Sequence, residues 1–503
     1  MTDVYKRKRK LVTSMILVMV GILILSLAMT EQGRAQPLYG GILRIAYSAD
    51  PAHLNRAIQS SSIIAICSRN ILQGLVYVSP TFEIKPDLAE SWDISADGLT
   101  YTFHLVKNAT WHDGHNFTAE DVVFNIENVG PQYESTAKSA FSELESVVAL
   151  DQYTVRCQFK SPPTGLLYFM GIGFLVVPKH LYEDTDIPSN EYNLKPVGTG
   201  PFKFYEWVKG SHITLVRNEN YWRGGKPYLD RLIFKIIPDS TARALAAETG
   251  EVDYIPFYGF PFSSIETLNQ LPNFQVHDKT SEQAYSTQLQ WHLNNRHPIL
   301  GNASVRKALA YAINKAFILE TSYYGYGKLS TSSIPSSISW AYKADNPYAN
   351  IEFDATIANQ LLDDAGYPKD AGGTRFSFNL VYDKGPTEFT KTAEILRENL
   401  NAIGVDLQLT PYDRAGFVDA YSNWLFDSLL FRAGEGPDPS RTATRYASWN
   451  IAKGSYGSNC VGYNNSRIDE LYELGGSVVP LDERKPYYYE IQEILGEDCQ
   501  LFA

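Results

Sequence analysis

Two histidines three positions apart, His112 and His115, come closest in type and spacing to a chemical site. Imidazole nitrogens bind transition metals, but a metal centre needs at least a third ligand, and none stands nearby in the sequence. The segment that holds the histidines, residues 111–115, is also typical of a polar turn that leads into a helix at Thr118. We therefore interpret the segment as a turn and expect no metal site.

The chain lacks the common catalytic patterns. It contains no HExxH, no GxSxG and no phosphate-binding loop. Carboxylates are plentiful, but an acid–base couple is defined by its separation in the fold and cannot be assigned here. We expect no catalytic residue and no cofactor, and we predict that the protein is not an enzyme; a secreted hydrolase is an alternative.

Length and charge limit the class of protein. A chain of 503 residues suggests about three domains or two large lobes. The net charge of −12, with no basic patch beyond the N-terminus, argues against a nucleic-acid partner. Aromatic residues make up 13% of the chain, and such side chains suit either a core or a binding cleft.

The first 35 residues differ from the rest of the chain. A basic stretch at 6–10 precedes an uncharged apolar run from Leu11 to Met29, and small residues stand before a possible cleavage point at Gln36. This pattern is typical of a secretory signal peptide, but the run is also long enough for an uncleaved membrane anchor. In both cases we expect an exported protein, in the periplasm or at the cell surface.

Four cysteines in an exported chain permit disulfide bonds, with three possible pairings. We predict a bond between Cys460 and Cys499, with free buried thiols as the alternative for all four, Cys67 and Cys157 included. No two cysteines have CxxC spacing, so the sequence does not support a zinc site built from them.

The first half of the chain is richer in strands than in helices. Alternating apolar and polar residues predict strands at 99–105 and 153–159, and residues 63–76 predict a helix. The sequence Gly198-Thr199-Gly200-Pro201 predicts a tight turn, because glycine tolerates positive φ and proline fixes its own φ. We expect a mixed sheet in this half.

Beyond a polar junction at about residues 279–288, helices and strands alternate more regularly. Apolar residues from Val305 to Phe317 lie on one helical face, and so do those from Phe389 to Ile403. Strands are predicted at 376–382 and 405–409. This alternation predicts an α/β lobe.

Five blocks of the sequence resemble the family 5 extracellular solute-binding proteins, the peptide- and nickel-type receptors of ABC importers. The blocks are Leu88–Glu127, Val197–Tyr254, Asn302–Ile318, Ala358–Lys369 and Asn459–Leu471. They follow the order of the family over nearly everything after Gln36.

The resemblance implies an α/β fold with two lobes joined by a hinge, of the type II periplasmic-binding-protein class, with an extra subdomain inserted in lobe one. It implies these divisions: an N-terminal segment at 1–35, the main sheet of lobe one at 36–80 and 197–285, the inserted subdomain at 81–196, and lobe two at 286–503. Family chains usually continue and cross back to lobe one, so we expect this chain to be truncated.

The resemblance also suggests where a ligand binds. Peptide binders of the family hold the α-amino group of the ligand with an acidic residue just before a -PDP- motif. Here Glu435 takes that position, and Asp438 belongs to the motif. Arg432 replaces an aromatic residue; it could pair with a ligand carboxylate, stack on a ring or neutralise Glu435. Further cleft candidates by position, each with core packing as the alternative, are Tyr47, Trp340, Trp424 and Trp449.

The resulting hypothesis is a receptor that captures short peptides between its lobes and delivers them to an ABC permease. Association with the membrane through the N-terminus is part of this hypothesis. The alternatives are oligosaccharide or metal-chelate binding by the same fold, and a membrane-tethered sensor or chaperone.

Overall fold

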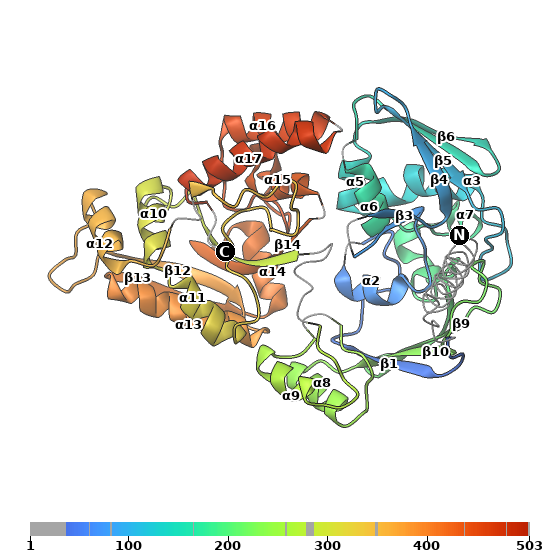
Figure 1. Cartoon of the computed structure of the whole chain (residues 1–503), viewed down its shortest axis with the longest axis horizontal. Coiled ribbons are helices and arrows are strands. Elements are labelled where there is room, and N and C mark those ends of the chain that lie inside the picture. The colour runs from blue at the N-terminus through green and yellow to red at the C-terminus, as the bar shows by residue number, and fades with distance from the viewer. Residues whose placement is uncertain are drawn as a thin grey trace, which may run out of the picture.

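The chain forms two α/β lobes, which lie side by side in Figure 1. The computed structural model describes residues 37–59, 61–80, 83–163, 165–256, 259–277, 286–347, 351–436, 438–478 and 480–500. The predicted signal or anchor, the last three residues and most of the predicted junction lie outside these ranges. Within them, no helix combines the length and the apolar character needed to cross a membrane.

The main sheet of lobe one is mixed, as predicted. Its order is β1–β10–β9–β8. The strands are β1 (Ile42–Tyr47), β8 (Phe202–Val208), β9 (His212–Arg217) and β10 (Arg231–Ile236). β1 pairs with β10 in parallel, and the other neighbours are antiparallel. The helices α8 (Ser240–Glu248) and α9 (Ile265–Asn269) follow β10 and lie near lobe two (Figure 1).

The helix predicted at 63–76 is shorter than expected, because α2 spans only Ser62–Ser68. The side-chain amide of Asn70 donates to the carbonyl of Ile66 at 2.9 Å, at the point where the helix ends. The chain then runs through irregular structure into β2 (Val76–Val78). The prediction was wrong because residues 70–72 pack on a turn that is distant in sequence and do not continue the helix.

That turn is the Gly198–Pro201 segment, and its glycines serve a different purpose from the one predicted. The N–H of Gly200 donates to the carbonyl of Ile71 at 2.8 Å. A Cβ atom on Gly198 would lie 1.8 Å from the same oxygen. Neither glycine has a positive φ. Close approach of two backbones, and not positive φ, therefore requires glycine here.

A second sheet of lobe one has the order β4–β5–β7–β6 and is antiparallel throughout. Its strands are β4 (Ala89–Ile94), β5 (Thr100–Leu105), β6 (Leu144–Asp151) and β7 (Thr154–Phe159), which confirms the predicted strands at 99–105 and 153–159. A short hairpin of β2 and β3 (Ile84–Pro86) lies beside it. The helices here are α3 (Ala119–Phe124), α4 (Gly130–Tyr133), α5 (Ser135–Ala140), α6 (Leu166–Ile172) and α7 (Lys179–Tyr182), with a π-helical segment at Asn125–Val129.

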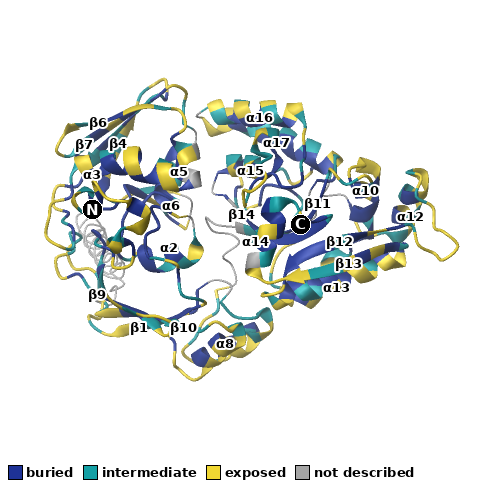
Figure 2. Ribbon diagram, turned by 180° about the vertical axis from the view of Figure 1, so that it is seen from behind, coloured by how far each residue is buried: buried dark blue, intermediate teal, exposed yellow. Residues whose placement is uncertain are grey.

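Lobe two is an α/β lobe, as the alternation of elements predicted, and helices cover both faces of its sheet. The sheet has the order β11–β14–β12–β13, with β11 (Ser286–Leu293), β12 (Phe376–Asp383), β13 (Val405–Tyr412) and β14 (Ser428–Glu435). β12 runs parallel to both β13 and β14. Figure 2 shows β11 and β12 as buried strands between helices with exposed outer faces.

The two faces of this sheet bury separate cores. Phe378 and Leu380 face α10, α12 and α13, whereas Leu429 and Phe431 face α14, α16 and α17. The helices of lobe two are α10 (Ala303–Ala312), α11 (Lys315–Tyr323), α12 (Ala355–Asp364), α13 (Thr387–Ala402), α14 (Arg414–Asn423), α15 (Ala443–Tyr446), α16 (Ser466–Ser477) and α17 (Leu481–Glu497). All four cysteines are buried free thiols, so the predicted Cys460–Cys499 bond is wrong and the alternative holds.

The lobes touch on two sides. The ring of Phe262, beside α9, meets the ring of Tyr323 in α11 edge-on, with centroids 5.1 Å apart. On another side, the backbone of Gly165 at the start of α6 comes so close to lobe two that an added Cβ would lie 3.8 Å from Cγ of Asp438.

Candidate functional site

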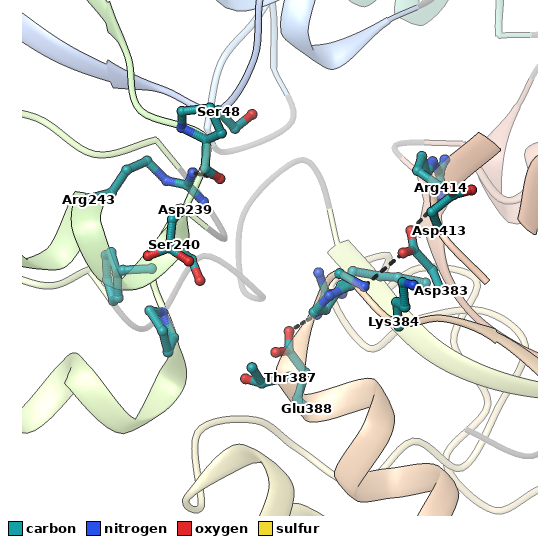
Figure 3. A pocket seen from close by; sticks show the side chains of 16 residues that line it. Ser48, Asp239, Ser240, Arg243, Asp383, Lys384, Thr387, Glu388, Asp413 and Arg414 are labelled. Carbon is teal, nitrogen blue, oxygen red and sulfur yellow. Dashed lines mark hydrogen bonds and ion pairs between the residues drawn. The ribbon is translucent and has the colours of Figure 1, made fainter. Parts of the chain in front are cut away.

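A cavity of about 520 Å³ lies between the lobes, within the usual size range of ligand pockets. Lobe one lines it with the residues that follow β1 and β10, and lobe two with those that follow β12 and β13. Both lobes thus present the carboxyl ends of parallel strands, which is where open α/β sheets bind ligands. Figure 3 shows the two walls facing each other across the cavity.

Lobe two supplies most of the charged groups. Arg432 on β14 donates to a carboxylate oxygen of Glu388 at 2.7 Å, and both side chains are largely buried. Glu388 comes from the first turn of α13, so the pair joins the sheet to the helix at the cavity wall. The guanidinium carbon of Arg432 also lies 5.2 Å from the ring centroid of Phe389. Glu388 was not predicted as a partner of Arg432.

A second ion pair on this wall is more open. A guanidinium nitrogen of Arg414 lies 3.5 Å from a carboxylate oxygen of Asp383, and the Arg414 side chain is 61% exposed. Asp383 also accepts a hydrogen bond from the N–H of Gly385 at 2.9 Å. Asp413 caps α14 by accepting from the N–H of Gly416 at 2.8 Å. The carboxylates are therefore fixed by the backbone. Arg414 also donates to the hydroxyl of Tyr456 at 3.1 Å, but most of its side chain is open to solvent.

The wall of lobe one carries one buried cation and one carboxylate. The guanidinium of Arg243 donates to the carbonyls of Ile237 and Pro238, each at 2.7 Å. Burial lowers the pKa of Arg243, and the nearby charge of Asp239 opposes that shift. Asp239 caps α8 by accepting from the N–H of Ala242 at 2.7 Å.

Of the residues that the sequence suggested as ligand contacts, Arg432 is among the described residues that line the cavity. Glu435 is the last residue of β14, and its side chain is outside the description. Asp438 is buried and accepts two hydrogen bonds from Arg484, each at 2.8 Å. Asp438 therefore forms a buried ion pair next to the contact between the lobes at Gly165.

The four aromatic candidates are absent from the described lining of the cavity. Tyr47 is buried against Phe234, with ring centroids 5.6 Å apart. Trp340 packs edge-on against Tyr488. The Arg296 guanidinium lies over the ring of Trp424, 3.7 Å from its centroid, and Trp449 is half exposed.

Most of the charged residues that line the cavity were not among the predicted ligand contacts. These residues are Asp239, Arg243, Asp383, Lys384, Glu388, Asp413 and Arg414. The strands at 376–382 and 405–409 and the helix after the first of them were predicted. Charged residues between a parallel strand and its following helix were therefore the available signal.

Comparison with known proteins identifies the wider group. Residues 83–454 match the model of the bacterial extracellular solute-binding proteins, family 5. The chain is 26% identical to the oligopeptide-binding protein AppA of Bacillus subtilis over 484 residues, which cover 93% of this chain and 86% of AppA. It is 30% identical to the heme-binding protein A of Haemophilus influenzae over 437 residues, 82% of this chain and 77% of that protein.

A solved structure is also similar. NikZ from Campylobacter jejuni, in complex with Ni(L-His), aligns with a TM-score of 0.77 and 26% identity over 92% of this chain and 91% of NikZ. The two-lobed architecture is therefore that of family 5 binding proteins.

Proposed function

Because this chain belongs to the bacterial extracellular solute-binding proteins of family 5, we propose that it captures short peptides in the interlobe cavity and delivers them to an ABC permease. Members of this family are substrate-binding proteins and work outside the cytoplasm. Anchoring through the N-terminal segment, or its removal as a signal peptide, is part of the proposal.

The observation that carries the peptide proposal is the mixture of charges in the cavity. Its lining includes four carboxylates and four basic groups: Asp239, Asp383, Glu388 and Asp413, with Arg243, Lys384, Arg414 and Arg432. A short peptide carries an ammonium group at one end and a carboxylate at the other. A cavity with both signs can pair both ends, whereas an apolar or single-sign cavity would leave one charge desolvated and unpaired.

We assign the two ends of the peptide by exposure and position. Arg414, which is 61% exposed, and the exposed Lys384 can reach a ligand carboxylate. We assign the α-amino group of the peptide to Glu435, the acidic residue at the end of β14. Arg432 is held by Glu388 and supports the wall.

Metal chelates are the second candidate, because NikZ has a similar structure and was solved with Ni(L-His). An amino-acid chelate offers a carboxylate to the same basic groups. Oligosaccharides fit less well: sugar binding favours aromatic platforms, and Phe260 is the aromatic residue within the described lining.

Calorimetric titration with an unmodified tripeptide, its N-acetyl form and its C-terminal amide tests the proposal. We expect Arg414→Ala to weaken binding of the free-carboxylate peptide about tenfold, which is ~1.4 kcal/mol, and to leave the amide unaffected. Glu435→Gln should weaken binding of the free amine and leave the N-acetyl form unaffected.

The matched control is Arg467→Ala, since Arg467 is a half-exposed arginine paired with Glu490 on the outside of lobe two. It should bind all three peptides as the wild type does. If no peptide binds and Ni(L-His) or hemin does, the peptide proposal is wrong and the corresponding alternative replaces it.

A further inference from the structure

Three metal-ligating side chains meet on the surface of lobe one, away from the interlobe cavity. They are Asp113, His115 and His180, whose ligand atoms all lie within 4.8 Å of one another. Nε2 of His180 is 2.7 Å from Oδ2 of Asp113, and Nδ1 of His115 is 3.2 Å from Oδ1. The centroids of the two imidazole rings are 4.1 Å apart, and the ring planes are tilted by 32° relative to one another.

The third ligand that the sequence did not show is His180, which stands 67 residues beyond Asp113. The histidine first paired with His115, His112, has a different role. Its Nδ1 accepts from the N–H of Gly198 at 3.2 Å, and its Nε2 bonds the carbonyl of Gly200 at 3.0 Å. These two hydrogen bonds fix the ring to the Gly198–Gly200 backbone, so His112 anchors the 111–115 turn.

The opposite side of the cluster is anchored as firmly. His180 lies in α7, and the N–H of Lys179 before it donates to Oδ1 of Asp121 at 3.0 Å. The other carboxylate oxygen of Asp121 accepts from the N–H of Thr118 at 2.9 Å, so one buried carboxylate joins α7 to the start of α3. The backbones that carry the ligands are therefore held in place from two sides.

The ligand set is that of a transition-metal site. Two imidazoles and one carboxylate bind zinc at about 2.0–2.2 Å, which in a tetrahedral site separates the ligand atoms by roughly 3.4 Å. The two histidine nitrogens lie 2.7 and 3.2 Å from different oxygens of Asp113, and one ligand atom from each residue lies within 4.8 Å of the others, so small side-chain rotations suffice. The side chain of His115 is 65% exposed, which leaves room for water at the remaining position.

We propose that Asp113, His115 and His180 form a surface site for a divalent transition-metal ion, with Zn²⁺ as the probe. The site is separate from the interlobe cavity, whose described lining contains no histidine and no cysteine. A bound ion joins α7 to the turn at 111–115 and leaves capture of a ligand between the lobes to other residues.

The chain offers a matched control in His104 and Asp93, on the neighbouring strands β5 and β4. Their Nε2–Oδ2 distance is 2.8 Å, close to that of the His180–Asp113 pair, and both side chains are exposed. No third ligand joins this pair among the described residues. It therefore separates metal binding from an ordinary histidine–carboxylate hydrogen bond.

The test is equilibrium dialysis with Zn²⁺ on chelator-treated protein that carries no polyhistidine tag. We expect one Zn²⁺ per chain, at least tenfold weaker binding in His115→Ala and in His180→Gln, and unchanged binding in His104→Ala. Zn²⁺ should also raise the Tm of the wild type more than that of His115→Ala.

His115→Ala alone decides the matter if His180→Gln does not fold, because the exposed His115 ring contributes little to packing. The proposal is overturned if His115→Ala binds Zn²⁺ as tightly as the wild type, or if His104→Ala loses as much affinity. In either case the cluster is a set of structural hydrogen bonds.

Discussion

Replacing Asp438 by asparagine should strongly destabilise lobe two, although the sequence first suggested this residue as a ligand contact. Asp438 and Arg484 form a bidentate ion pair with both N–O distances at 2.8 Å. The side chains are only 8% and 4% exposed. Asp438→Asn keeps the shape of the side chain and removes its charge, so Arg484 remains a buried cation with neutral partners.

The magnitude follows from that burial. After the substitution, Arg484 still donates to the carbonyl of Gly475 at 2.8 Å and to the hydroxyl of Tyr488 at 3.0 Å. The guanidinium then has no carboxylate beside it. Removing one partner of a buried ion pair lowers the free energy of unfolding by about 3–5 kcal/mol. Burial opposes ionisation of Asp438, but the hydrogen bonds and charge of Arg484 outweigh it and hold the pKa of Asp438 below its ordinary value.

This pKa shift fixes the sign of the pH dependence. A carboxyl whose folded pKa lies below its unfolded value stabilises the fold above the unfolded pKa, about 3.9, and loses that contribution as the pH falls. The destabilisation by Asp438→Asn should therefore be full at pH 7 and shrink in acid.

Urea unfolding followed by tryptophan fluorescence measures the effect, since Trp340 lies 5.2 Å from the Arg484 guanidinium. Glu490→Gln is the matched control. It breaks a pair of similar geometry, with Arg467 nitrogens 2.7 and 2.9 Å from Glu490, that is 40–44% exposed. We expect the control to change stability little. If both variants lose the same small amount, the argument from burial is wrong.

Three further predictions test other parts of the structure. Gly198→Ala should destabilise lobe one by ~1–3 kcal/mol, because its Cβ would meet the carbonyl oxygen of Ile71. Gly224→Ala is the control, since its Cβ would meet no atom within 4 Å. Equal urea midpoints for the two variants would contradict this prediction. The four buried thiols should react with a thiol reagent only after unfolding, because burial keeps the reagent out and raises the pKa of Cys460 to about 12. A Cys460–Cys499 disulfide found by peptide mass mapping without reduction would refute the prediction. Burial lowers the pKa of His292 to about 3, below its unfolded value. The wild type should therefore lose about 1.4 kcal/mol per pH unit from this group as the pH falls below about 6.5. His292→Gln should lack that slope, and identical slopes in the two proteins would count against this prediction.

The fold was predictable wherever pattern and packing agree. Strand alternation at 99–105 and helix–strand alternation in lobe two were confirmed, because each pattern reflects one buried face. The prediction of one helical face from Val305 to Phe317 was wrong at its C-terminal end. The side chain of Asn314 accepts from the N–H of Phe317 at 2.9 Å and starts a new helix, so Phe317 is 48% exposed.

The site was harder to predict because its partners are distant in sequence. Arg432 meets Glu388 across 44 positions, and Asp438 meets Arg484 across 46. A motif can mark such a residue but cannot say which charge will face it. His180 shows the same limit: residues 111–115 gave part of a cluster, and the fold supplies the rest.

The central claim is that ligand binds between the two lobes, and hydrogen exchange with a saturating short peptide tests it most directly. We expect slower exchange of backbone amides at both walls. In lobe one the protected segment runs from the end of β10 into the start of α8 (238–243), and in lobe two the protected segments follow β12 and β13 (383–388 and 413–416). Protection confined to one lobe, or found away from these segments, would contradict the account.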